Sequence, residues 1–193
     1  RLRCDWSSDV CSSDLTATAR ATASPRKIPQ ENKLLSNIIV RDAAAADCAT
    51  LAAMAGALLI QHGIMVPDDL ADALRRDGFG DEPRFEAMIA EHQGEPVGMT
   101  LYYPVYRPSL AGHGLLMEDL YVIPEARRLG VGRALMVRLA RLAISRGCVY
   151  IEWLVESGNL PAETFYKATG ATMDDDKMTC QIDGTALINL AGE

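Results

Sequence analysis

Two neighbouring carboxylates, Glu118 and Asp119, interrupt an apolar run that otherwise has the composition of a buried strand, from Leu115 to Val122. Pro124 ends that run. Acidic side chains are rarely buried without a partner, so this interruption needs a reason. The residues that follow build an anion site, and a carboxylate beside an anion site suggests a reaction rather than only a fold.

The anion site is predicted from two glycines and three arginines. Gly130 and Gly132 open an amphipathic helix, whose first N–H groups are unpaired and lie at the positive end of the helix dipole. Neither residue has a Cβ atom, so a pyrophosphate can approach the backbone closely. Arg127, Arg128 and Arg133 add positive charge at the same place. The alternative is an ordinary strand–turn–helix unit with surface arginines.

This block resembles the coenzyme A motif of the GNAT family of N-acetyltransferases, in which that signature binds the pyrophosphate of acetyl-CoA. A second block, Asn159–Ala171, resembles the family's Asn-x-x-Ala-x-x-Phe-Tyr-x-x-x-Gly run and follows a predicted strand. Met117–Val122, Asp77–Gly80 and Phe165–Lys167 are similar to the spermidine/spermine (diamine) N-acetyltransferase branch. The likeness covers most of the chain, from about Ile38 to Gly184.

The resemblance implies direct transfer of an acetyl group from acetyl-CoA to a primary amine, in a ternary complex and without a covalent enzyme intermediate. An alkylammonium has a pKa of about 10, so a base must remove a proton before the amine attacks. Glu118 is the candidate base; its alternative is a structural carboxylate paired with an arginine. Tyr166 matches the family's general-acid tyrosine, with a packed aromatic ring as the alternative.

The resemblance also implies a set of coenzyme-binding residues. The backbone N–H groups of two strand residues, Leu120 and Val122, would polarise the thioester carbonyl. Asn159 would bond the coenzyme or only cap the helix that starts near Pro161. The full set is Leu120, Tyr121, Val122, Arg127, Arg128, Leu129, Gly130, Val131, Gly132, Arg133, Asn159 and Ala162.

The amine site departs from the polyamine branch. That branch carries acidic residues where this chain has Arg107 and, in the first helix region, about His62. Arg107 would repel a polycation and suits a carboxylate or phosphate; alternatively, it points to solvent. We therefore predict a small amine that bears an acidic group, such as a lysine analogue. Arg107 would bind the acid, and Glu118 and Asp119 would handle the amine.

Strand and helix patterns predict an α+β fold (an α/β sandwich), with a central mixed, mostly antiparallel sheet flanked by helices. Leu115 to Val122 has the apolar and β-favouring content of a strand, and from Gly130 to Arg146 the apolar residues recur with the period of a helix. The other expected strands are Ile38–Arg41, Phe85–His92, Val97–Tyr103, Cys148–Val155 and Met178–Ile182, and the other helices are Asp47–Ile60, Asp68–Arg76 and one from Asn159.

The composition of the chain limits the classes of partner that it is expected to bind. The chain has 193 residues, a net charge of −7 and 49% hydrophobic residues, which fits one globular domain and argues against nucleic acid or an anionic membrane as a partner. No apolar run has the roughly 20 residues of a membrane span. Three histidines in unlike contexts predict no metal site, and cysteines without disulfide spacing predict a cytoplasmic protein. A homodimer is expected from the resemblance alone.

Residues 1–15 are expected to be translated sequencing adapter, and residues 16–37 a disordered lead-in. The acetyltransferase domain is then predicted over residues 38–193. Two other functions stay open: acetylation of protein N-termini or lysines, and a non-catalytic acyl-CoA sensor. The candidate acid–base pair, Glu118 and Tyr166, weighs against the sensor.

Overall fold

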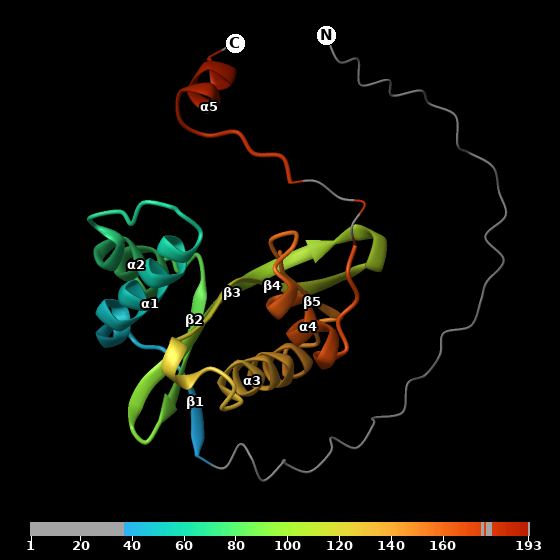
Figure 1. Ribbon diagram of the computed structural model, residues 1–193. Coiled ribbons are helices and arrows are strands. Elements are labelled where there is room, and N and C mark those ends of the chain that lie inside the picture. The colour runs from blue at the N-terminus through green and yellow to red at the C-terminus, as the bar shows by residue number, and fades with distance from the viewer. Residues whose placement is uncertain (1–36, 175, 177–178, 193) are drawn as a thin grey trace, which may run out of the picture. The chain divides into compact units, whose positions relative to one another are not determined.

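A five-stranded sheet forms the centre of the protein, and its order is β1-β2-β3-β4-β5 (Figure 1). The computed structural model describes residues 37–174, 176 and 179–192. All neighbouring strands are antiparallel except β4 and β5, which are parallel. The strands are β1 (Ile38–Asp42), β2 (Glu86–His92), β3 (Glu95–Arg107), β4 (Gly112–Val122) and β5 (Tyr150–Glu152). The α-helices are α1 (Cys48–Gln61), α2 (Leu70–Phe79), α3 (Val131–Ser145), α4 (Leu160–Thr169) and α5 (Gly184–Ala191), with short 3-10 turns η2 (Ala45–Asp47), η3 (Pro108–Leu110) and η4 (Pro124–Ala126).

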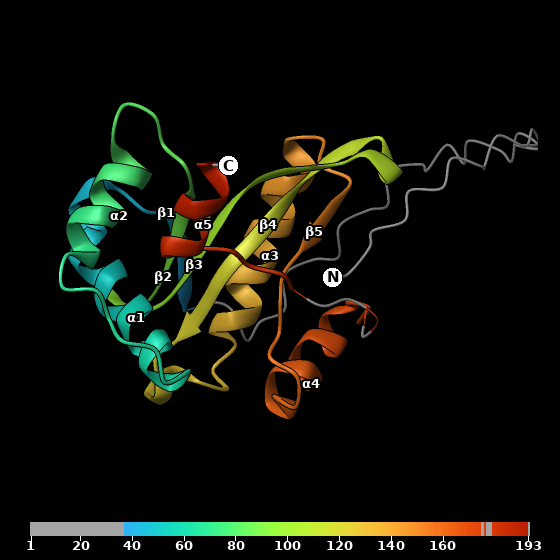
Figure 2. The same ribbon diagram turned by 90° about the horizontal axis from the view of Figure 1, so that it is seen from above.

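Each face of the sheet has its own hydrophobic core. On one face, α1 and α2 bury side chains such as Leu51 and Leu74 against Met99 and Tyr121. On the other face, α3 and α4 pack against the alternate residues of the same strands. Viewed from above, the sheet runs between α1 and α2 on one side and α3 on the other (Figure 2). This arrangement confirms the predicted mixed, mostly antiparallel sheet flanked by helices.

The end of the chain corrects one prediction. The expected closing strand does not form: Thr179–Ile182 has no regular structure and is exposed, and Met178 lies outside the described residues. Its polar members, such as Gln181, have no neighbouring strand to pair with. A short helix, α5, follows instead. β5 is also shorter than predicted, with three residues.

The parallel pair β4–β5 is brief. Only Gly114–Leu116 of β4 pair with Tyr150–Glu152 of β5. β4 continues to Val122, so its second half has β3 on one edge and, among the described residues, no strand on the other. This open edge lies next to the loop that leads into α3.

The N-terminal strand is tied to the first helix by an ion-pair network. Arg41 donates two hydrogen bonds to the Asp47 carboxylate, at 2.7 and 2.8 Å, and one to Glu91 at 2.7 Å. Asp47 also accepts from the backbone N–H of Ala44. These bonds hold the pKa of Asp47 below its usual range, because Arg41 stabilises the charged carboxylate.

No helix among the described residues is long and apolar enough to cross a membrane.

Asp47→Asn should lower the free energy of unfolding at pH 7 by about 1 kcal/mol, since it weakens charge-assisted bonds on a partly exposed pair. The folded-state pKa of Asp47 is depressed, so its contribution is present above the unfolded pKa of about 4 and is lost as pH falls through the folded value. Urea unfolding at a series of pH values should therefore show the mutant and wild type converging below about pH 4. Asp77→Asn, which breaks an exposed pair with Arg76, is the control; an equal loss there would contradict the assignment.

Candidate active site

A one-residue β-bulge in β4 positions the two carboxylates. Leu101 of β3 lies opposite Asp119, and the next residue, Tyr102, lies opposite Met117. Glu118 is therefore left without a partner on β3, which is the definition of a bulge. Bulges commonly re-aim a side chain next to an active site.

The bulge puts Glu118 and Asp119 on the same face of the sheet. Met117 and Leu120 both pack into the core beneath α3, whereas Tyr121 packs into the core beneath α1 and α2. Successive side chains in a regular strand alternate between faces. Glu118 follows Met117 directly and so lies on the opposite face, the α1–α2 face. Asp119 precedes Tyr121 by two residues and so lies on the same face as Tyr121. Both carboxylates are therefore on the α1–α2 face, although they are adjacent in sequence.

Glu118 is exposed and has one hydrogen-bond partner. Tyr103 of β3 donates its hydroxyl to a carboxylate oxygen of Glu118 at 2.9 Å. Burial, followed by the bond and charge of Glu118, raises the pKa of Tyr103 above its ordinary value, so the hydroxyl remains a donor. Tyr103 thus orients a carboxylate that is open to solvent.

Asp119 is half-buried beside it. Burial raises the pKa of Asp119, the neighbouring charge of Glu118 raises it further, and His62 acts in the opposite direction. A carboxylate with a raised pKa is a stronger proton acceptor than an ordinary surface carboxylate. The pair thus combines an exposed carboxylate with a half-buried one whose pKa is raised by burial.

His62 and Glu156 meet at the edge of this face. His62 follows the last residue of α1, and Glu156 lies in the loop between β5 and α4. His62 Nδ1 lies 3.2 Å from a carboxylate oxygen of Glu156. The contact joins two segments that are far apart in the sequence.

Arg107 was predicted to bind the acidic group of the substrate. The structure instead pairs its guanidinium with the Glu152 carboxylate on β5 and places it 4.6 Å from the centre of the Tyr150 ring. Both contacts link the end of β3 to β5, across the start of β4. This arrangement favours a structural role, because the positive charge of Arg107 is already balanced.

The predicted anion site lies where β4 leads into α3. Gly130 caps the helix with φ of 92°, and Arg128 also has positive φ, at 66°. The first backbone bond of the helix is from Ala134 N–H to the Gly130 carbonyl. Of the described residues, none accepts from the N–H groups of Val131, Gly132 and Arg133, which therefore remain available to an anion.

The side chains around this cradle have separate tasks. Arg127 donates from Nε to the Val122 carbonyl at 3.1 Å, which fixes the turn after β4. Arg128 and Arg133 are exposed. A Cβ on Gly132 would lie 3.3 Å from Phe165 of α4, so the glycine allows α4 to approach the start of α3. The exposed Leu129 and the buried Val131 can offer only backbone or apolar contact to a ligand.

The open edge of β4 presents unpaired backbone donors beside the cradle. Ile123 N–H bonds to Val97, and the Asp119 carbonyl accepts from Thr100, so these residues point their polar groups toward β3. Because alternate residues point to opposite edges, Leu120 and Val122 direct their N–H groups to the open edge. The side chain of Tyr121 is buried beneath α1 and α2, so only its backbone lies at this edge.

Tyr166 of α4 has a buried ring and an accessible hydroxyl. Its ring centre lies 4.9 Å from that of Trp153 and 5.1 Å from that of Phe165. Across the described part of the chain, every buried side-chain oxygen has a hydrogen-bond partner. The Tyr166 hydroxyl forms no hydrogen bond with these residues, so its oxygen is not buried and reaches solvent. Burial raises the pKa of Tyr166 to about 12, which keeps the hydroxyl protonated as a proton donor.

Asn159 serves the helix. Its side-chain oxygen accepts from the backbone N–H of Ala162 at 3.2 Å and caps α4. The capping alternative is therefore present in the structure, and it positions the helix that carries Tyr166.

Two residues of this face, Tyr103 and Glu156, were not predicted from the sequence. The strand alternation of β3 puts Tyr103 on the carboxylate face, but no local signal marks Glu156.

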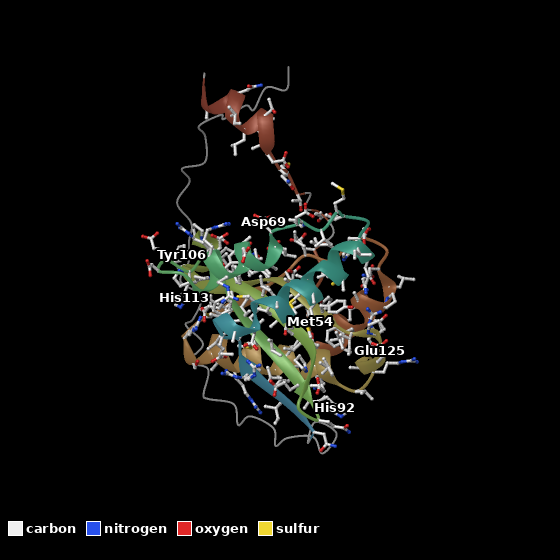
Figure 3. The ribbon with its side chains drawn as sticks, turned by 90° about the vertical axis from the view of Figure 1, so that its left-hand side faces the viewer. Met54, Asp69, His92, Tyr106, His113 and Glu125 are labelled. Atoms are coloured by element: carbon white, nitrogen blue, oxygen red, sulfur yellow. The ribbon has the colours of Figure 1, made fainter. Side chains whose placement is uncertain are left out.

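Two other features of the described residues are the absence of a metal cluster and a pocket beside α1. Within residues 37–174, 176 and 179–192, no group of three histidines, cysteines or carboxylates could hold an ion. His92 and His113 lie at opposite ends of the molecule (Figure 3). A pocket of about 500 Å³ on the α1 side contains one titratable group, Tyr121; its lining is Ala49, Thr50, Ala53, Met54, Ala57, Pro96, Tyr121 and Ile123.

Comparison with known proteins gives one consistent result. Residues 52–171 match the model of the acetyltransferase (GNAT) family. The chain is 31% identical over 171 residues to thialysine N-epsilon-acetyltransferase from Sus scrofa, covering 82% of this chain and 100% of that protein. It is 34% identical over 140 residues to spermidine/spermine N(1)-acetyltransferase-like protein 1 from Homo sapiens, covering 68% of this chain and 20% of that protein.

A solved structure supports the same fold. An integron cassette protein from the mobile metagenome of V. cholerae superposes with a TM-score of 0.71 at 26% identity, over 81% of this chain and 99% of that one. The family and the diamine-type branch predicted from the motifs are thereby confirmed.

The protonation state of Tyr166 can be measured directly. Tyrosinate absorbance should be the same in wild type and Tyr166→Phe up to pH 10.5, since the buried ring stays protonated, and should diverge only as pH approaches about 12. Circular dichroism at each pH checks that both proteins remain folded. A deficit of about half a tyrosinate in the mutant at pH 10, the value for an ordinary tyrosine, would contradict the assignment.

Proposed function

The chain belongs to the acetyltransferase (GNAT) family, and from this premise we propose that it transfers an acetyl group from acetyl-CoA to the side-chain amine of a lysine-like amino acid. The protein is an acyltransferase by its family and its named relatives. The substrate proposal rests on a site with two paired carboxylates and on likeness to an enzyme named for thialysine, a lysine analogue.

The observation that carries the proposal is the bulge in β4. It puts Glu118 and Asp119 on one face next to an open strand edge, whose donors continue into the α3 cradle. Proton acceptors for an amine, donors for a carbonyl and N–H groups for phosphates are therefore contributed by one continuous segment. The tyrosine of α4 adds a proton donor from a different element.

These residues can perform each step of an acyl transfer. Glu118 or Asp119 accepts a proton from the ammonium, and the neutral nitrogen then attacks the thioester carbon. The N–H groups of Leu120 and Val122 stabilise the oxygen as it gains charge. As the carbon–sulfur bond breaks, Tyr166 gives its proton to the departing sulfur. The nitrogen of the new amide loses its second proton to water, and Tyr166 regains a proton from solvent.

The cradle residues fit the coenzyme. The unpaired N–H groups of Val131, Gly132 and Arg133 and the exposed guanidinium of Arg128 suit a pyrophosphate. We propose that they hold this part of acetyl-CoA while the open edge of β4 receives its arm. Dimerisation and a cytoplasmic location stay predictions from the sequence.

A polyamine is the second candidate. Glu118, Asp119 and Glu156 give the site acidic character, which suits a polycation, and a human relative is named for spermidine and spermine. The amino-acid substrate is favoured because the likeness to the enzyme named for thialysine covers 82% of this chain and 100% of that protein, against 68% and 20% for the relative named for spermidine and spermine.

The proposal is tested by measuring free thiol released from acetyl-CoA with thialysine, lysine, ornithine, spermidine and a peptide lysine. We expect the amino acids to give the highest kcat/KM. Strong preference for spermidine would replace the substrate with a polyamine. Turnover with the peptide alone would indicate a protein acetyltransferase. Tight acetyl-CoA binding without turnover on any amine would indicate a sensor.

Tyr166→Phe should lower kcat by about 100-fold or more, because the departing sulfur loses its proton donor while the ring packing is kept. Affinity for acetyl-CoA, measured by calorimetry, should hardly change. Tyr106→Phe, at an exposed tyrosine labelled in Figure 3, is the matched control and should keep wild-type turnover. An unchanged kcat in Tyr166→Phe would remove the acid role.

A further inference from the structure

The His62–Glu156 pair has no part in the acyl-transfer steps, yet it lies at the rim of the same face. His62 Nδ1 is 3.2 Å from Glu156, and both side chains are accessible, at 36% and 68% of their full exposure. A surface pair of this kind contributes little to stability. Its position is set by two separate segments, the end of α1 and the loop that leads into α4.

The pair matches the head group of an amino acid. A free α-amino acid carries an ammonium and a carboxylate on one carbon, so its partner must present a negative and a positive group side by side. Glu156 offers a carboxylate to the ammonium. When it is protonated on both nitrogens, His62 can donate from Nδ1 to Glu156 and from Nε2 to the substrate carboxylate.

The pair is also placed where a head group is needed. His62 is close enough to influence Asp119 electrostatically, and Asp119 lies beside Glu118 on the α1–α2 face. A substrate with its reactive amine at the bulge would therefore extend its other end toward the rim. Arg107, the other candidate for the carboxylate, is already bound to Glu152.

We propose that His62 and Glu156 form a head-group site, in which Glu156 binds the α-ammonium and His62 the α-carboxylate of a lysine-like substrate. They are specificity-determining residues, and the inference rests on the proposed function. The site selects amino acids over simple amines of the same length, while the reaction at Glu118 and Asp119 is common to both.

Three amine substrates test the contributions of the α-ammonium and the α-carboxylate separately. Thialysine carries both charges, cadaverine keeps the second ammonium without the carboxylate, and pentylamine has neither. Each is assayed by thiol release with wild type, Glu156→Gln and His62→Asn. His92→Asn and Glu95→Gln are matched controls, because this histidine and glutamate face each other in the β2–β3 hairpin. Circular dichroism and urea unfolding check the fold of every variant.

Glu156→Gln should lower the thialysine-to-pentylamine ratio of kcat/KM by about 10- to 100-fold, the loss expected for a hydrogen bond to a charged group. His62→Asn should lower the thialysine-to-cadaverine ratio by about 10-fold or more. Both controls should keep wild-type ratios. KM is expected to carry most of the change, since the head group is bound alike before and during the reaction.

Other results would overturn the inference. Equal losses on all three acceptors would make the pair structural, and unchanged ratios would place the head group elsewhere. A rise in cadaverine turnover in His62→Asn above that of thialysine in wild type would identify a site for a second cation. If one of these results is obtained while the wild type acetylates thialysine, only the head-group site is rejected. If the wild type acetylates no amine, the proposed function is rejected as well.

Discussion

The bulge at Glu118 is the constraint on which the site depends. A regular β4 would place one of the two neighbouring carboxylates in the core beneath α3, where a charge without a partner is costly. One extra residue shifts the phase of the strand, so Met117 and Leu120 both stay in that core while the two acids leave it. The site and the α3 core therefore rely on the same local irregularity.

The open edge of β4 is the second requirement, and it follows from how β5 is held. β5 pairs with β4 over three residues and then leads away into the loop that carries Glu156. Contacts at the paired end, including Arg107 with Glu152 and Tyr150, hold β5 there. At the other end, α4 packs through Phe165 near the start of α3. The two strands are thus held at one end and free to diverge at the other.

Much of this could be predicted from local patterns. Apolar, β-favouring composition predicted β4, periodicity predicted α3, and the motif around Tyr166 predicted α4, because each depends on neighbours within one turn or strand. The adjacent acids in an apolar run were a visible break in alternation, although the bulge itself depends on register with β3. Contacts such as Tyr103 with Glu118, or His62 with Glu156, join distant segments and leave no local pattern. The strand predicted at Met178–Ile182 failed for the same reason, since a strand needs a neighbour that composition does not reveal.

An amine acetyltransferase faces two opposed demands, and the unequal carboxylates address both. Negative charge attracts an ammonium, but it also favours the protonated amine, which cannot attack. Glu118 is exposed and held by Tyr103, so it can act as the attracting anion. Asp119 is half-buried, and burial raises its pKa, which makes it a stronger proton acceptor than an ordinary aspartate. In the proposed reaction, this difference in burial lets one carboxylate attract the cation while the other accepts its proton.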